Sequence, residues 1–108
     1  MGNVWRTYYR VESPTQTFVD ASRQMESGEI WGKPARGSFF PKVKAYEGAL
    51  PEGKHGIEFM TDVEPDDGSP PGQACWSVGH PGVRLEGEFA KLNVKVIRVV
   101  YPNAVTRV

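Results

Sequence analysis

Two glutamates, Glu86 and Glu88, stand on either side of Gly87, directly before the most strand-like stretch of the chain. If this segment is extended, both side chains point to one face and their carboxylates lie about 6 to 7 Å apart. Like charges this close raise the pKa of at least one carboxyl group in a partly dry site. Such a pair suits one carboxylate that binds a sugar hydroxyl and another that activates a nucleophile. The alternative interpretation is a solvent-exposed turn, where glutamates are common.

Arg10 and Thr61 are the other polar residues whose predicted positions suit chemistry. Arg10 lies near the end of the first predicted strand, beside a predicted helix N-terminus, where a guanidinium group suits a pyrophosphate. The alternative for Arg10 is an ordinary surface or ion-pair arginine. Thr61 lies on the apolar face of its predicted strand, so its hydroxyl needs a hydrogen-bond partner. That hydroxyl either orients a catalytic glutamate or bonds to nearby backbone.

The sequence predicts no metal site and no internal disulfide. Cys75 is the single cysteine, and the two histidines, His55 and His80, lack clustered carboxylates around them. A zinc site would need more nitrogen or sulfur ligands than this. Phosphate-loop, dinucleotide-binding and nucleophile-elbow motifs are also missing from the sequence.

We predict that these residues are positioned by an α+β fold that forms a single domain over residues 1–108. A helix is expected over about residues 14–27, because Ser13 can cap it, Pro14 suits its first position and Gly28 ends it. This helix is expected to pack on a mostly antiparallel sheet. Twelve glycines and nine prolines predict long loops between the elements. The predicted strands cover residues 4–11, 56–63, 74–78 and 92–101.

Side-chain alternation gives two details of these strands. In the first, Trp5, Thr7 and Tyr9 share one face, and Arg6, Tyr8 and Arg10 share the other. In the last, the alternation slips around Ile97, which predicts a bulge or burial on both faces.

The composition of the chain limits which ligands and which cellular location we expect. Thirteen basic and thirteen acidic residues give a formal net charge of zero, and the basic residues are scattered along the chain. We therefore expect no extended nucleic-acid ligand, since such binding needs clustered cations. No segment approaches the roughly 20 apolar residues of a membrane span, and no signal-peptide core is seen at the N-terminus. The expected location is the cytoplasm, or the inside of a target cell for a delivered effector.

The order of these residues resembles the arginine–serine–glutamate class of ADP-ribosyltransferase toxin domains. Arg10 in "YYRVES", Thr61 in "FMTD" and the glutamates of "EGEFAKLNVKVIRVV" carry the resemblance, although the middle motif of the class is Ser-Thr-Ser. The resemblance implies that Arg10 holds the phosphates of NAD, with NAD as a substrate. It also implies that Glu88 stabilises the oxocarbenium-like transition state, and that Glu86 positions the acceptor. Trp31 or Phe40 would then contact nicotinamide.

Two functions follow from these observations. The first is an NAD-using ADP-ribosyltransferase or NAD glycohydrolase, with a protein as one acceptor. The second is a non-catalytic, β-rich protein-interaction module, such as an immunity, adaptor or phage accessory protein, whose aromatic residues hold a partner. Convergence of Arg10, Thr61 and Glu88 in one cleft would favour the first function.

Overall fold

The structure is a computed structural model of the whole chain, and it describes residues 4–12, 23, 26–32 and 40–100. In this part of the chain the backbone forms eight β-strands. They are β1 (Arg6–Glu12), β2 (Glu29–Gly32), β3 (Lys42–Glu47), β4 (His55–Thr61), β5 (Gln73–Ser77), β6 (Val83–Glu86), β7 (Phe89–Asn93) and β8 (Lys95–Val100).

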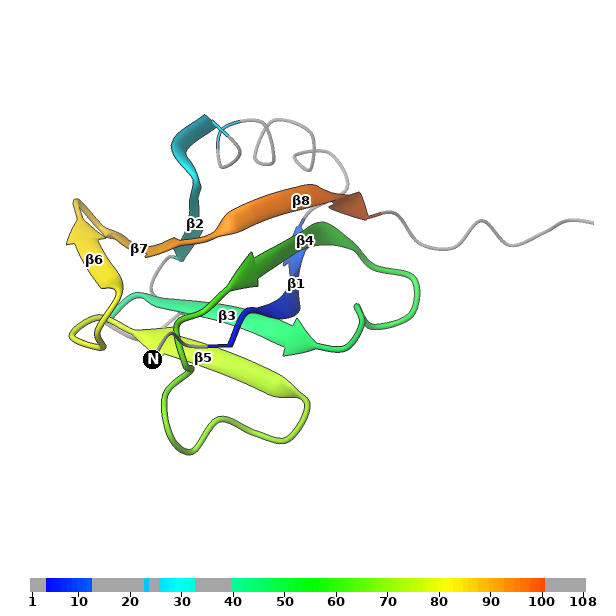
Figure 1. Cartoon of the computed structure of the whole chain (residues 1–108), viewed down its shortest axis with the longest axis horizontal. Helices are drawn as coiled ribbons and strands as arrows, with labels where there is room; N and C mark the ends of the chain where they lie inside the picture. The colour runs from blue at the N-terminus through cyan, green and yellow to red at the C-terminus, as the bar shows by residue number, and fades with distance from the viewer. Residues whose placement is uncertain (1–3, 13–22, 24–25, 33–39, 101–108) are drawn as a thin grey trace, which may run out of the picture.

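The strands form two antiparallel sheets (Figure 1). The larger sheet has the order β5-β3-β1-β4-β8, and the smaller has the order β2-β7-β6. Only Val94 separates β7 from β8, so the chain passes from the small sheet to the large one at this residue. The Val94 amide donates a hydrogen bond of 3.0 Å to the Gly28 carbonyl, which ties the crossing to the start of β2.

Apolar side chains from both sheets form the core. Trp76, Tyr8 and Phe59 are its largest members, and each is almost fully buried. The Tyr8 and Trp76 rings meet edge to face with their centroids 5.0 Å apart, a favourable arrangement for aromatic pairs. The small sheet contributes Ile30 and Leu92, which are fully buried as well. Full burial of each large apolar side chain contributes about 1.5–3 kcal/mol, so these contacts hold the two sheets together.

Two glycines allow backbone segments to approach closely. A Cβ atom on Gly32 would lie 2.0 Å from the Lys42 carbonyl oxygen, and one on Gly56 would lie 2.2 Å from the Arg10 carbonyl oxygen. Real Cβ atoms do not come this close to backbone, so neither position accepts a side chain without movement. Gly32 thereby sets the end of β2 against the start of β3.

The predicted α+β class is wrong. Strands make up 57% of the structure and helical residues 4%, with no helix in the part that can be described. Most of the predicted helix, residues 14–27, and its cap Ser13 lie outside the described residues. The helix prediction rested on capping and spacing within one segment, whereas pairing with distant strands determines the rest of this chain.

The four predicted strands overlap β1, β4, β5 and the pair β7–β8. The predicted irregularity at Ile97 is confirmed as a bulge, because Glu58 pairs with Arg98 and the next residue, Phe59, pairs with Val96. Three strands, β2, β3 and β6, were not predicted as such over their full lengths.

Candidate interaction face

Glu86 and Glu88 lie at a hairpin and not along one strand. Glu86 ends β6 and pairs with Phe89 of β7, so Gly87 and Glu88 form a two-residue turn. Gly87 has a φ of 63°, whereas no described residue other than glycine has a positive φ. This combination identifies a type II′ turn, with glycine in its first position. The expectation that Glu86 and Glu88 share one face of an extended segment is therefore wrong.

Glu86 is neutralised by two cations of its own sheet. Its carboxylate oxygens lie 2.8 Å from Arg84 Nη2 and 3.1 Å from Lys91 Nζ. Hydrogen bonds from Arg84 and then Lys91 lower the pKa of Glu86, which is opposite to the expected rise for a carboxylate pair. Lys91 also lies over the Trp31 ring, 4.6 Å from its centroid. The structure thus brings Glu86 and Trp31 together through Lys91.

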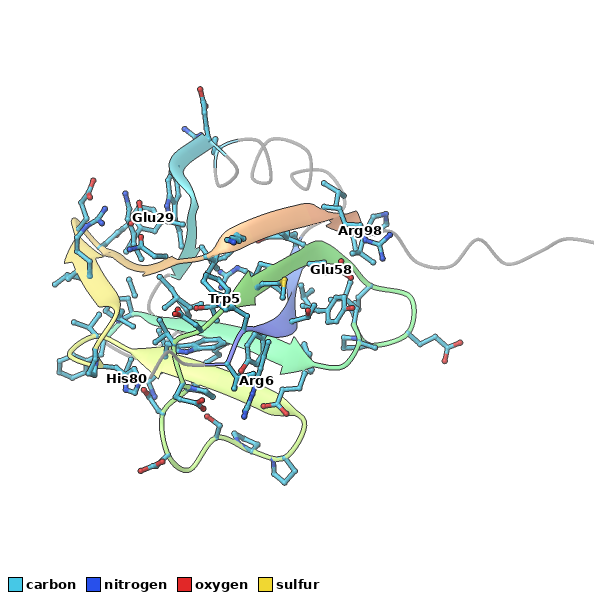
Figure 2. All side chains as sticks on the ribbon, in the orientation of Figure 1. Trp5, Arg6, Glu29, Glu58, His80 and Arg98 are labelled. Carbon is cyan, nitrogen blue, oxygen red and sulfur yellow. The ribbon has the colours of Figure 1, made fainter. Side chains whose placement is uncertain are left out.

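The same cation–anion series continues to β2. Arg84 Nη1 lies 2.7 Å from a carboxylate oxygen of Glu29, whose side chain is largely buried. Figure 2 labels Glu29 on β2. Arg84 is therefore shared between Glu29 and Glu86, and these hydrogen bonds raise the pKa of its guanidinium group. Charges of opposite sign alternate along this face of the small sheet, so its carboxylates already have partners.

Thr61 and Arg10 both have partners within the fold. Thr61 is 1% exposed; its hydroxyl donates to the Asn93 carbonyl at 3.3 Å and accepts from the Val63 amide at 3.1 Å. Arg10 Nε donates to Glu12 Oε1 at 3.1 Å. The Thr61 hydroxyl is thus used in holding the end of β4 to the end of β7.

Arg10, Thr61 and Glu88 do not form one cleft. Arg10 pairs with Ile57 on β4, and Thr61 lies four residues further along that strand, about 13 Å away. Glu88 precedes Asn93, the hydrogen-bond partner of Thr61, by five residues, or about 16 Å of extended chain. Phe40, the other predicted nicotinamide contact, precedes β3 and is 72% exposed.

The side of the five-stranded sheet that points away from the core carries a group of aromatic and aliphatic side chains. We call it the outer face. Trp5 is 43% exposed and Val11 is 38% exposed, although both are large apolar residues. Tyr9, Tyr46 and Met60 are partly exposed. Strand alternation and register place Tyr9, Val11, Tyr46 and Met60 on one side of β1, β3 and β4, in the centre of the sheet, and Trp5 directly precedes β1.

Cations surround this group on the same face. They are Lys42 and Lys44 of β3 and Lys95 and Arg98 of β8. Lys95 Nζ lies over the Trp5 ring, 4.8 Å from its centroid, which fixes the position of the indole. Four of the basic residues that are scattered in the sequence therefore lie at the two sides of one face.

A carboxylate is held in the middle of the outer face by its neighbours. Glu58 accepts two hydrogen bonds from Arg98, at 3.1 and 3.4 Å, and Figure 2 shows the two side chains together. These bonds lower the pKa of Glu58, and a hydrogen bond with the Tyr9 hydroxyl adds to the effect. The same contact raises the pKa of Tyr9. Tyr9, Glu58 and Arg98 thus form a fixed row across β1, β4 and β8.

The edge of this sheet at β5 is capped by Asp66. The Asp66 amide donates to the Cys75 carbonyl at 2.7 Å, and its carboxylate accepts from the Ser77 amide at 3.0 Å. The Ser77 hydroxyl also donates to this carboxylate. His80 Nδ1 lies 3.1 Å from the other carboxylate oxygen, and Figure 2 labels this histidine. The loop that carries Asp66 therefore occupies backbone groups of an edge strand.

A pocket of about 280 Å³ lies where this loop meets the outer face. Its strand side is formed by Lys42, Lys44, Gln73 and Cys75, and its loop side by residues 66–70. The outer face therefore ends in a polar hollow beside β5.

Family models, curated proteins and solved structures give no match to this chain. In the ranges that the structure describes, no three His, Cys, Asp or Glu side chains are grouped as a metal site would require. No helix among the described residues has the length and apolar character needed to cross a bilayer. Function is therefore inferred from the arrangement of side chains alone.

Proposed function

We propose that this chain is a non-catalytic binding domain that holds a protein partner on its outer face. The observation that carries the proposal is the partly exposed group Trp5, Tyr9, Val11, Tyr46 and Met60 on a five-stranded sheet. Aromatic residues and methionine are enriched at the centres of protein interfaces, and polar residues form their rims. The lysines and Arg98 around this group fit such a rim.

The sheet supplies rigidity to this surface. Tyr9 is tied to Glu58, and Trp5 is covered on one side by Lys95, so both rings are ordered before a partner arrives. Ordered side chains lose less conformational entropy on binding, which increases affinity without new contacts. The outer face is therefore preorganised for binding a partner. Arg10, Thr61 and Glu88 are dispersed, and this dispersal does not support a preorganised NAD site.

Site-specific photo-crosslinking tests this proposal. A photoreactive phenylalanine at Thr7, which lies on the outer face, should give a covalent adduct with a protein in the cells that encode the chain. The same group at Glu52, an exposed residue of the β3–β4 loop, is the matched control and should give none. Equal adducts from both positions, or none from Thr7, would contradict the proposal.

The NAD-using transferase or glycohydrolase stays a prediction, and a separate assay distinguishes it. The purified chain is mixed with NAD, with and without candidate protein acceptors, and nicotinamide release is followed. A non-catalytic domain releases none. Release that falls by a factor on the order of 100 in Glu88→Gln, as expected when a preorganised electrostatic group is lost, would favour the enzyme.

A further inference from the structure

The free edge of β6 differs from the capped edge of β5. β6 is the last strand of the small sheet, and Figure 1 shows it at the periphery of the molecule. Leu85 is 53% exposed, and the side chains of Arg84 and Glu86 are more than half exposed. An exposed edge strand is a template for another strand, and proteins usually cover or blunt such edges. Among the described residues no strand pairs with this edge of β6, and the edge carries an exposed leucine.

The hairpin geometry shows which backbone groups point outward. In a two-residue hairpin the residues that flank the turn, here Glu86 and Phe89, form a hydrogen-bonded pair. Because orientation alternates along a strand, Arg84 and Glu86 direct their amide and carbonyl groups toward β7. Leu85 therefore directs its amide and carbonyl groups toward the free edge.

The side chains of β6 are complementary to a second copy of themselves. If two β6 strands pair antiparallel about a two-fold axis at Leu85, the two leucines lie opposite each other. Arg84 then lies opposite the partner's Glu86, and Glu86 lies opposite the partner's Arg84. Opposite charges at paired positions stabilise an antiparallel register, and a two-fold axis makes each contact occur twice.

Leu85 is 53% exposed, and its cross-strand neighbour gives it little cover. Its cross-strand neighbour on β7 is Ala90, which has only a methyl group with which to cover a leucine side chain. A second Leu85 at the paired position would cover the side of this leucine that faces away from β7. The ion pair of 2.8 Å between Arg84 and Glu86 within one strand would become part of a group of four alternating charges across the pair.

From this pattern we infer that the chain self-associates through β6, so that the small sheets of two copies become continuous. The contact is short, and short contacts give weak association, so the dimer forms as the concentration rises. The β6 edge belongs to the small sheet and the outer face to the large one. A test of self-association through β6 therefore gives a result that is independent of the proposed function.

Sedimentation velocity of the full chain over a range of concentrations tests this inference. Wild type should shift from monomer to dimer as its concentration rises. Leu85→Lys should remain monomeric at concentrations where wild type is mostly dimer, whereas Glu52→Lys, a charge change elsewhere, should behave as wild type. Thermal melting confirms that each variant is folded. A wild type that stays monomeric, or a dimer that survives Leu85→Lys, would overturn the inference.

Charge exchange gives a sharper version of this test. Arg84→Glu alone places like charges opposite each other in the pair, and so does Glu86→Arg alone, so each variant should fail to self-associate. A mixture of the two variants should form a heterodimer. Both changed and unchanged positions of the Arg84→Glu copy are then acidic, and each faces a basic residue of the Glu86→Arg copy. A merely structural role of these residues would not produce this rescue. Failure of the mixture to associate would overturn the pairing.

Discussion

At the scale of single residues, the structure gives Thr61 a role in stability. Its hydroxyl joins the Val63 amide to the Asn93 carbonyl in the buried region between β4 and β7. We predict that Thr61→Val, which keeps the shape and removes the hydroxyl, lowers the free energy of unfolding by about 1–3 kcal/mol. Urea denaturation measures this, with Thr7→Val on the outer face as the matched control. An unchanged midpoint for Thr61→Val would contradict the assignment.

The lowered pKa of Glu58 makes the free energy of unfolding depend on pH. Arg98 lowers the pKa of Glu58 in the folded chain, so the folded state holds this proton less tightly than the unfolded state does. The stability from the Glu58 charge is therefore full above the unfolded pKa of about 4.3 and is lost as the pH falls through the lower folded pKa. Glu58→Gln should be less stable than wild type at neutral pH, and the difference should shrink in acid. Urea titrations at several pH values measure it; a difference that does not vary with pH would disagree.

At the scale of elements, alternation was read correctly where a strand has one buried face. In β1 the sequence separates Thr7 and Tyr9 from Arg6, Tyr8 and Arg10, and the register with β4 keeps that separation, whereas Trp5 precedes the strand. The sequence could not show which group faces the core, because Tyr8 is buried by Trp76 and Phe59 from distant strands. Local pattern fixes the period of a strand, whereas its partners fix which side is buried.

The missed strands show why local signals were insufficient. β3 reads "KVKAYE", and its buried residues are Val43 and the small Ala45, which give a weak apolar alternation between lysines. β6 reads "VRLE", and its alternation of apolar and polar residues is too short to distinguish a strand from a loop. Both form strands because a longer neighbour supplies their hydrogen bonds, and this neighbour cannot be read from the segment itself.

Gly56 gives a prediction for the pairing of β1 and β4. A Cβ atom there would lie 2.2 Å from the Arg10 carbonyl oxygen, so Gly56→Ala must push the two strands apart. We expect a loss of at least about 2 kcal/mol in the free energy of unfolding, the scale of an overpacked interior. Differential scanning calorimetry measures the change, with Glu52→Ala in the neighbouring loop as the control. A melting temperature like that of wild type would show that Gly56 does not lie too close to the Arg10 carbonyl to accept a side chain.

At the scale of the whole molecule, order along the chain did not predict proximity. Arg10, Thr61 and Glu88 occur in the order expected of the transferase class, yet the sheets place them at separate points. The outer face has the opposite property, since its residues come from β1, β3, β4 and β8 and share no motif. A net charge of zero likewise concealed the cations at the two sides of this face. Only the strand order brings these residues together.

If the outer face holds a protein partner, Trp5 should contribute strongly to the binding of that partner. The measurement is the yield of the covalent adduct formed from a photoreactive group at Thr7, with Trp5→Ala and Phe40→Ala compared in the same chain. Both substitutions remove an exposed aromatic ring, but Trp5 is one of the five residues of the outer-face group and Phe40 is not. We expect Trp5→Ala to lower the adduct yield at least about tenfold, as loss of a central interface residue does, and Phe40→Ala to leave it unchanged. An adduct yield that survives Trp5→Ala, or falls equally in both variants, would contradict the claim.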